Sequence, residues 1–217
     1  MPERPTCPIC RKRRPERFCP AKGEKICAVC CGTEREVTLD CPFDCSYLIA
    51  AHRYEIEHRK PPTADELPFP DVEFSSDLVY ANQPLLATFG YAILRFAAER
   101  PAVADHEALL ALTTLAETYR TLSSGIYYEN PPAEPLANGL YTALSAAVAD
   151  YKKQVGSRPG IPAVKDGDIF FLIIFLARMA RSWTNGRPRA RLFLQFLRTQ
   201  FPDVQPQQQE TSRIIAP

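Results

Sequence analysis

Residues 7–45 read CPICRKRRPERFCPAKGEKICAVCCGTEREVTLDCPFDC and contain all eight cysteines of the 217-residue chain. A segment of about 40 residues rarely buries enough apolar surface to fold alone, and metal ions or disulfides normally supply the missing stability. Cys7-x2-Cys10 and Cys27-x2-Cys30 are closely spaced pairs. Such pairs are typical of structural Zn²⁺ sites, because a tight turn brings both sulfurs to about 2.3 Å from one ion. The spacing predicts a small zinc-stabilised module that binds two ions.

The other four cysteines form a second ligand set, which comprises Cys19, Cys31, Cys41 and Cys45. Adjacent residues such as Cys30 and Cys31 point in different directions and seldom ligate one ion together, so we expect them to serve different ions. Ligands of the two sites then alternate along the chain, and each ion clamps segments that the other does not. All eight thiols would be used for structure.

Eight is an even number, so a disulfide framework is the main alternative to zinc, and an iron–sulfur cluster is a further one. Disulfides need an oxidising compartment. The opening residues MPERPTCPIC contain charges and prolines but no apolar core of a secretory signal, and positions 46–217 contain no cysteine. Both features favour a reducing compartment. We therefore expect zinc and a cytoplasmic protein.

One spacing pattern resembles the B-box zinc finger, namely Cys7-x2-Cys10 followed by Phe18-Cys19-x3-Gly23-x2-Ile26-Cys27-x2-Cys30. That family is a cross-brace around two Zn²⁺ ions, and the MYND and HIT zinc fingers share its general layout. The resemblance covers residues 7–45 only, and the helical remainder resembles no family that we recognise. It implies that the first ligand pair joins the third, which gives site 1 the ligands Cys7, Cys10, Cys27 and Cys30.

The resemblance and one spare cysteine together give site 2 the ligands Cys19, Cys31, Cys41 and Cys45. The last two stand where the family usually has histidines, and Lys22 stands where it expects aspartate or cysteine. Lysine cannot serve as a ligand here, so Cys31 is the substitute that we predict. His52 is the alternative fourth ligand. If Cys31 does ligate, His52 is expected to be a solvated residue of a short helix.

The chain divides into a cysteine module, a short helix, a proline-rich linker, an all-α domain and a disordered tail, with bounds 1–45, 46–60, 61–73, 74–202 and 203–217. Four prolines within residues 61–70 exclude a continuous helix from the linker. Apolar stripes at helical spacing predict a bundle of about five helices, near 82–99, 105–124, 134–155, 166–185 and 188–202. The fourth is apolar on all sides and should lie at the centre of the bundle.

Basic residues are unevenly distributed, although the formal net charge is only +1. Residues 1–25 hold eight basic and three acidic residues, and residues 178–198 hold six arginines and no acid. The longest apolar run covers the nine residues 169–177, whereas a membrane span needs about 20. We therefore expect no membrane partner.

The preferred functional interpretation is a zinc-binding, non-catalytic scaffold that binds protein partners or associates with itself. Modules of the B-box type generally mediate such contacts. A site whose ligands are all structural thiolates leaves no open position for a catalytic water. Histidines are few and scattered, and there is no glycine loop for a nucleotide. We therefore expect no enzymatic activity.

Two alternatives remain open. The run Arg11-Lys12-Arg13-Arg14 lies between two cysteines, and basic residues on a rigid zinc scaffold can contact the phosphates of a nucleic acid. No aromatic residue interrupts this run for base stacking, and such a run is often only a solvated surface. The second alternative is an enzyme or small-molecule receptor, in which the arginines of residues 178–198 line a groove for an anion.

Overall fold

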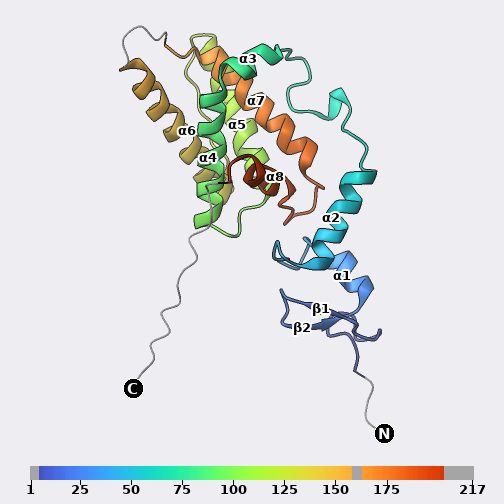
Figure 1. The fold of residues 1–217 in the computed structure, drawn as a ribbon. Helices are drawn as coiled ribbons and strands as arrows, with labels where there is room; N and C mark the ends of the chain where they lie inside the picture. Colours follow the sequence, from blue (N-terminus) through green and yellow to red (C-terminus); the bar gives the residue numbers. More distant parts are fainter. Residues whose placement is uncertain (1–4, 158–162, 203–217) are drawn as a thin grey trace, which may run out of the picture.

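The computed structural model describes residues 5–157 and 163–202. The tail expected at 203–217 lies outside the described residues. The fold has two parts (Figure 1), a cysteine-rich module at the N-terminal end and a helical bundle, with one helix between them. Two separate clusters of buried apolar side chains correspond to these parts. Each part therefore has a core of its own.

The module consists of a hairpin followed by a helix. The hairpin pairs β1 (Arg17–Cys19) with β2 (Glu24–Ile26) in an antiparallel register. In the turn between them, Gly23 has a φ of +70°. Glycine adopts this conformation readily, whereas residues with a Cβ atom disfavour it. Helix α1 (Ala28–Glu34) follows at once, and the Cys27 sulfur accepts a hydrogen bond from the Cys30 N–H at its first turn. The first strand of the hairpin thus ends at Cys19, and the helix starts from Cys27.

Helix α2 (Ser46–His58) lies where the short helix was predicted and leads from the module to the bundle (Figure 1). Its N-cap is Cys45. The proline-rich segment after it contains one short 3₁₀ turn, Ala64–Glu66, in which the Glu66 carboxylate accepts from the Thr63 N–H at 2.8 Å. Three carbonyl groups of this segment, those of Pro68, Phe69 and Val72, accept hydrogen bonds from the Arg178 side chain. The segment is therefore held against the bundle rather than free.

The bundle has six helices in the described residues, whereas the sequence predicted about five. They are α3 (Ser76–Ala81), α4 (Gln83–Glu99), α5 (Asp105–Ser123), α6 (Pro135–Gly156), α7 (Asp166–Trp183) and α8 (Leu192–Gln200). The additional helix, α3, has six residues and is too short to show an apolar stripe. Beyond the module, the described residues form helices and connecting segments without a strand, so an all-α bundle after a cysteine-rich segment is confirmed.

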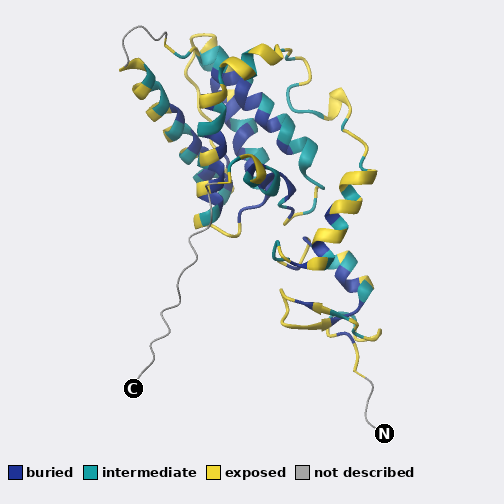
Figure 2. Ribbon diagram, viewed as in Figure 1, coloured by how far each residue is buried: buried dark blue, intermediate teal, exposed yellow. Residues whose placement is uncertain are grey.

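The continuous apolar sequence predicted a central place for α7, but α5 packs against three helices, α6, α7 and α8, whereas the helices packed against α7 are α5 and α8. Eight residues of α7 are buried, and eight of α5; Figure 2 shows buried stretches on several helices of the bundle, including α7. Helix α5 packs along it, and α4 packs against α6. Within the part of the chain that the structure describes, no helix combines the length and the apolar character that crossing a membrane requires.

Candidate metal centre

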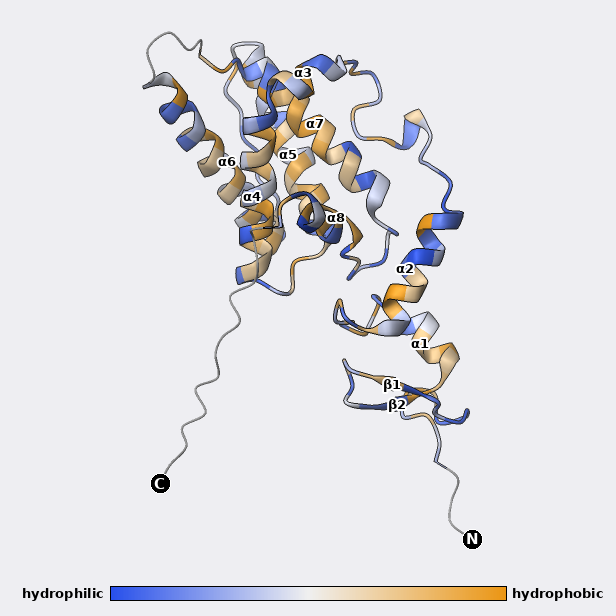
Figure 3. Ribbon diagram, viewed as in Figure 1, coloured by the Kyte–Doolittle hydropathy of each residue, from blue (hydrophilic) through white to orange (hydrophobic). Residues whose placement is uncertain are grey.

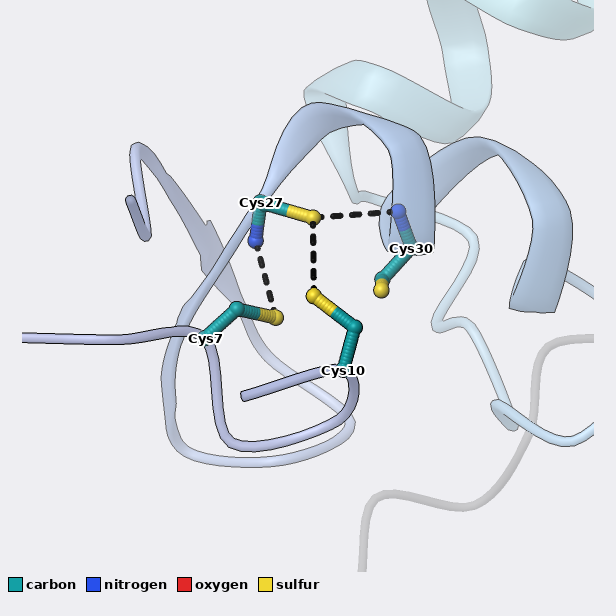
Figure 4. Close-up of side chains that lie close together, drawn as sticks. All are labelled: Cys7, Cys10, Cys27 and Cys30. Carbon is teal, nitrogen blue, oxygen red and sulfur yellow. Dashed lines mark hydrogen bonds between the residues drawn. The ribbon is translucent and has the colours of Figure 1, made fainter. Parts of the chain in front are cut away.

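The first four predicted ligands come together at the base of the module (Figure 4). The sulfur atoms of Cys7, Cys10, Cys27 and Cys30 all lie within 4.8 Å of one another. The Sγ atoms of Cys10 and Cys27 are 3.9 Å apart, far beyond a disulfide bond and close to the ~3.8 Å edge of a tetrahedron with 2.3 Å metal–sulfur bonds. All eight cysteines are free thiols in the structure. The quartet has the dimensions of a tetrahedral metal site.

Hydrogen bonds lower the pKa of one of these thiols, whereas burial and neighbouring sulfurs raise the pKa of another. The backbone N–H groups of Lys12 and Arg13 lower the pKa of Cys10 to about 6. Burial and the neighbouring sulfurs raise the pKa of Cys30 to about 12. Four sulfurs at this separation cannot all be thiolates unless a cation lies between them, because each negative charge opposes the next. The donor set therefore fits a divalent ion that prefers sulfur ligands.

The second set of cysteines lines one small cavity. Its wall includes the four predicted site 2 ligands, Cys19, Cys31, Cys41 and Cys45. The cavity volume is about 10 Å³, which is roughly the space for one ion or one water molecule. These sulfurs lie farther apart than those of site 1, which is the one quartet within 4.8 Å among the described residues. Cys30 and Cys31, adjacent on α1, therefore point to different clusters.

A cationic residue, Arg35, also lines the second cavity. Its Nε atom is buried without a hydrogen-bond partner. An unpaired buried guanidinium N–H is costly. The four cysteines thus share this cavity with a cationic residue.

His52 was weighed as an alternative ligand of site 2 or as a solvated residue, and the structure gives it another role. It is buried, with 5% of its surface exposed. Its Nε2 atom lies 3.0 Å from Oε1 of Glu36, and His52 is not among the residues that line the second cavity. The expectation that it would be solvated is wrong, because the carboxylate of Glu36 meets it inside the protein.

Glu36 joins the module to the bundle. Besides His52, its carboxylate accepts a hydrogen bond from Asn185 Nδ2 at 2.9 Å, and its carbonyl accepts from the Arg189 N–H at 2.9 Å. Burial alone would raise the pKa of Glu36, but His52, Asn185 and the charge of Arg187 outweigh it and lower the pKa. The backbone of Glu36 has a φ of +55°, which few side chains adopt. Sequence patterns gave no signal for this residue.

Most of the arginines of residues 178–198 are also used in contacts between segments. Arg187 donates to the carbonyls of Gly32 and Arg35 at 3.1 and 2.6 Å. Arg191 pairs with Asp40 at 2.7 Å, and Arg198 lies over the Phe43 ring at 4.4 Å. An open cleft of about 570 Å³ between α2 and the end of α7 is lined in part by Arg181 and Arg187. The stretch thus serves mainly to hold the module, and only partly to line a groove.

The basic loop of the module is followed in the chain by an exposed aromatic residue. Residues 11–14 are all exposed. Phe18 in β1 is 54% exposed and lies directly opposite Lys25 in β2, so the two side chains share one face of the hairpin. The sequence shows no aromatic residue within the basic run, and the hairpin register was needed to find this one.

Comparisons with known proteins identify no relative. No family model, no curated protein and no solved structure matches the chain. The resemblance to B-box modules therefore stays an expectation from cysteine spacing, and the four clustered cysteines are compatible with a zinc site without indicating a family.

Proposed function

We propose that the chain is a zinc-stabilised, non-catalytic protein that presents surfaces for binding other proteins. The observation that carries the proposal is the site 1 quartet, whose four sulfurs lie within 4.8 Å of one another. Four cysteine ligands complete a tetrahedral zinc shell, which is the pattern of structural rather than catalytic sites. The metal then holds the module, and the function lies in the surfaces that the module and the bundle expose.

A second zinc ion, bound by the second cysteine set, belongs to the same proposal. Its support is the small cavity that the four sulfurs share and the unpaired donor of Arg35 beside it. Because the ligands of both ions alternate along the chain, both are needed to fix the module. Elemental analysis of the purified full chain should return about two zinc equivalents. One equivalent would remove the second site from the proposal.

Affinity capture with the full chain tests the interaction function. Bound proteins are identified by mass spectrometry before and after treatment with a zinc chelator, and the Cys27→Ser variant replaces the chelator in a parallel capture. We expect partners that are retained by the zinc-loaded chain and lost or reduced without zinc. A zinc-loaded chain that captures no protein and does not associate with itself contradicts the proposal.

Nucleic-acid binding is the second candidate, because Phe18 and Lys25 share a face of the hairpin that follows the exposed basic residues 11–14 in the chain. An aromatic ring can stack on a base while cations contact phosphates. Binding to single-stranded RNA or DNA would then weaken steeply with salt. Phe18→Ala should reduce affinity with little change in the salt slope, and joint charge reversal of Arg13 and Arg14 should reduce the slope without releasing zinc. No binding at low salt excludes this candidate.

A further inference from the structure

The open cleft beside α2 has the size of a small-molecule site. Its volume is about 570 Å³, within the range of about 300–1,000 Å³ in which such sites fall. One part of its lining comes from residues between 54 and 60, at the end of α2, and another from residues between 181 and 187, at the end of α7 and in the loop after it. Figure 3 shows hydrophilic stretches at both of these helix ends. The cleft is therefore polar, and it brings together two segments that are far apart in the sequence.

The lining carries two more positive than negative charges. Its cations are Arg59, Lys60, Arg181 and Arg187, and its carboxylates are those of Glu55 and Glu66. Both carboxylates already accept hydrogen bonds from the protein, Glu55 from Asn185 Nδ2 at 3.0 Å and Glu66 from the Thr63 N–H at 2.8 Å. The excess of positive charge favours an anion as the ligand.

Several donors of these cations have no partner within the described residues. Arg181 and Lys60 make no side-chain hydrogen bond or ion pair there. Arg187 uses its Nη1 atom for the carbonyls of Gly32 and Arg35, which leaves its Nε and Nη2 atoms without a partner in the same part of the chain. A guanidinium group with two such donors matches the oxygen atoms of a phosphate group. The cleft thus has the donors that a phosphate needs.

An aromatic pair on α2 lines the same cleft. The rings of Tyr54 and His58 are stacked, with their centroids 4.0 Å apart and their planes 20° apart. Both residues are exposed, and 62% of the surface of Tyr54 is accessible. A nucleobase stacks on an exposed aromatic ring without regard to its sequence identity. A planar platform beside unpartnered cations is the combination that a nucleotide requires.

We infer that this cleft binds a nucleoside phosphate. The base stacks on the pair formed by Tyr54 and His58, and the phosphate accepts hydrogen bonds from Arg181 and Arg187. Such a site needs no glycine loop, because arginine side chains rather than backbone N–H groups contact the phosphate. This ligand is separate from the protein partners proposed above, so either proposal can hold without the other.

The cysteine module helps to position one of the two arginines. The carbonyls that hold Arg187 belong to Gly32 and Arg35, at the end of α1. Asn185, in the same loop, donates to the carboxylate of Glu36 at 2.9 Å. Unfolding of the module by removal of zinc would release this loop from one side. Nucleotide affinity should therefore depend on zinc although no zinc ligand lines the cleft.

Calorimetric titration of the zinc-loaded full chain at low salt tests the inference, with AMP, adenosine and ribose 5-phosphate as probes. AMP should bind at least about tenfold more tightly than either of the other two, because adenosine lacks the phosphate and ribose 5-phosphate lacks the base. Arg181→Gln and Tyr54→Ala should each raise the Kd for AMP about tenfold. The matched controls Arg95→Gln on α4 and Tyr80→Ala on α3 change exposed residues and should bind AMP like the wild type.

Each outcome decides a part of the inference. A wild-type chain that does not bind AMP, or an equal loss in Arg95→Gln and Arg181→Gln, overturns it. Equal affinities for AMP and ribose 5-phosphate overturn the assignment of the base to the aromatic pair, and equal affinities for AMP and adenosine overturn the phosphate site. AMP binding that is unchanged after zinc chelation excludes a role of the module. If AMP does not bind but the zinc-loaded chain captures a protein, the cleft inference fails while the interaction function stands.

Discussion

Asp105 places a carboxylate in the interior of the bundle, with 1% of its surface exposed. Its two oxygens accept hydrogen bonds from the N–H groups of Phe193 and Leu194, at 3.1 and 3.2 Å. The side chain thereby caps the first turn of α8 from the start of α5, and the Asp105 N–H donates to the Ala190 carbonyl at 2.7 Å. One residue thus fixes where α8 begins.

The pKa of Asp105 leads to a pH dependence of stability. Burial raises this pKa from 3.8 to about 7, although the amide donors oppose the shift. Between about pH 4 and pH 7 the folded state therefore holds more protons than the unfolded state, and the free energy of unfolding falls as the pH rises through this window. Asp105→Asn removes this titration. Between pH 5 and pH 8, the variant should gain up to about 3 kcal/mol relative to the wild type.

Urea unfolding at several pH values measures this difference, and the contributions of other groups cancel between the two proteins. Asp150→Asn removes the same charge from an exposed position on α6 and should follow the wild type at every pH. If Asp105→Asn and the wild type change in parallel, the carboxylate is ionised throughout and its hydrogen bonds outweigh its burial.

The zinc content of their variants distinguishes the roles of Cys31 and His52. Cys31 lines the second cavity, whereas His52 binds Glu36. Cys31→Ser should therefore lose about one zinc equivalent. His52→Ala should keep both ions but lower the free energy of unfolding by about 1–3 kcal/mol, because Glu36 loses a buried partner. Elemental analysis and thermal unfolding of both variants check this. Loss of zinc from His52→Ala together with full zinc in Cys31→Ser would reverse the assignment.

Spacing along the chain was sufficient to group Cys7, Cys10, Cys27 and Cys30, and insufficient to find the polar contacts between distant segments. The two CxxC pairs are local, and a short turn determines that their sulfurs converge. Asn185 lies 149 residues from Glu36, and Phe193 lies 88 residues from Asp105. No local pattern relates residues at such separations, so the polar contacts at the interface appear only when the elements are packed.

At the scale of elements, apolar stripes and end signals located the long helices closely. Helix α5 occupies Asp105–Ser123 where 105–124 was predicted, because Ser123-Ser124-Gly125 interrupts a continuous stripe. Helix α8 begins at Leu192 rather than near 188, because Asp105 caps it from another helix. The proline-rich segment was predicted as a linker from its composition. Its composition does not reveal that the side chain of Arg178 holds this segment against the bundle.

Arg178 anchors that segment. Its guanidinium donates to the carbonyls of Pro68, Phe69 and Val72 at 3.1, 2.5 and 2.7 Å. Phe69 has a φ of +55°. Arg178→Gln should lower the free energy of unfolding by about 1–3 kcal/mol, because three partly buried carbonyls lose their donors. Hydrogen exchange in residues 66–74 should become faster.

Arg181→Gln is the matched control, one turn farther along α7. Arg181 lines the open cleft beside α2 and makes no side-chain hydrogen bond in the described part of the chain. The Arg181→Gln substitution should leave hydrogen exchange in residues 66–74 unchanged. Equal effects of the two substitutions would mean that charge on α7, rather than the three carbonyl contacts, holds the segment.

At the scale of the whole molecule, two cores meet through a small polar interface. The buried cluster of the module consists largely of cysteines with Ile26 and Leu39, whereas the bundle has its own extended apolar cluster. Between them lie Glu36 with its partners and the arginine contacts of the segment that follows α7. Such an interface couples the parts without making either core depend on the apolar side chains of the other.

Zinc removal should therefore unfold the module and spare the bundle. Each structural ion contributes on the order of 10 kcal/mol to local folding, and the module has little apolar surface to replace it.

A chain lacking residues 1–60 should keep helical circular dichroism and a cooperative thermal transition, at a lower temperature than the full chain, because the contacts of Arg187 and Asn185 are lost. Cys27→Ser in the full chain should give the same helical signal with reduced zinc. An insoluble or non-helical truncated chain would show that the bundle requires the module to fold, and the interface around Glu36 would then be part of a single core.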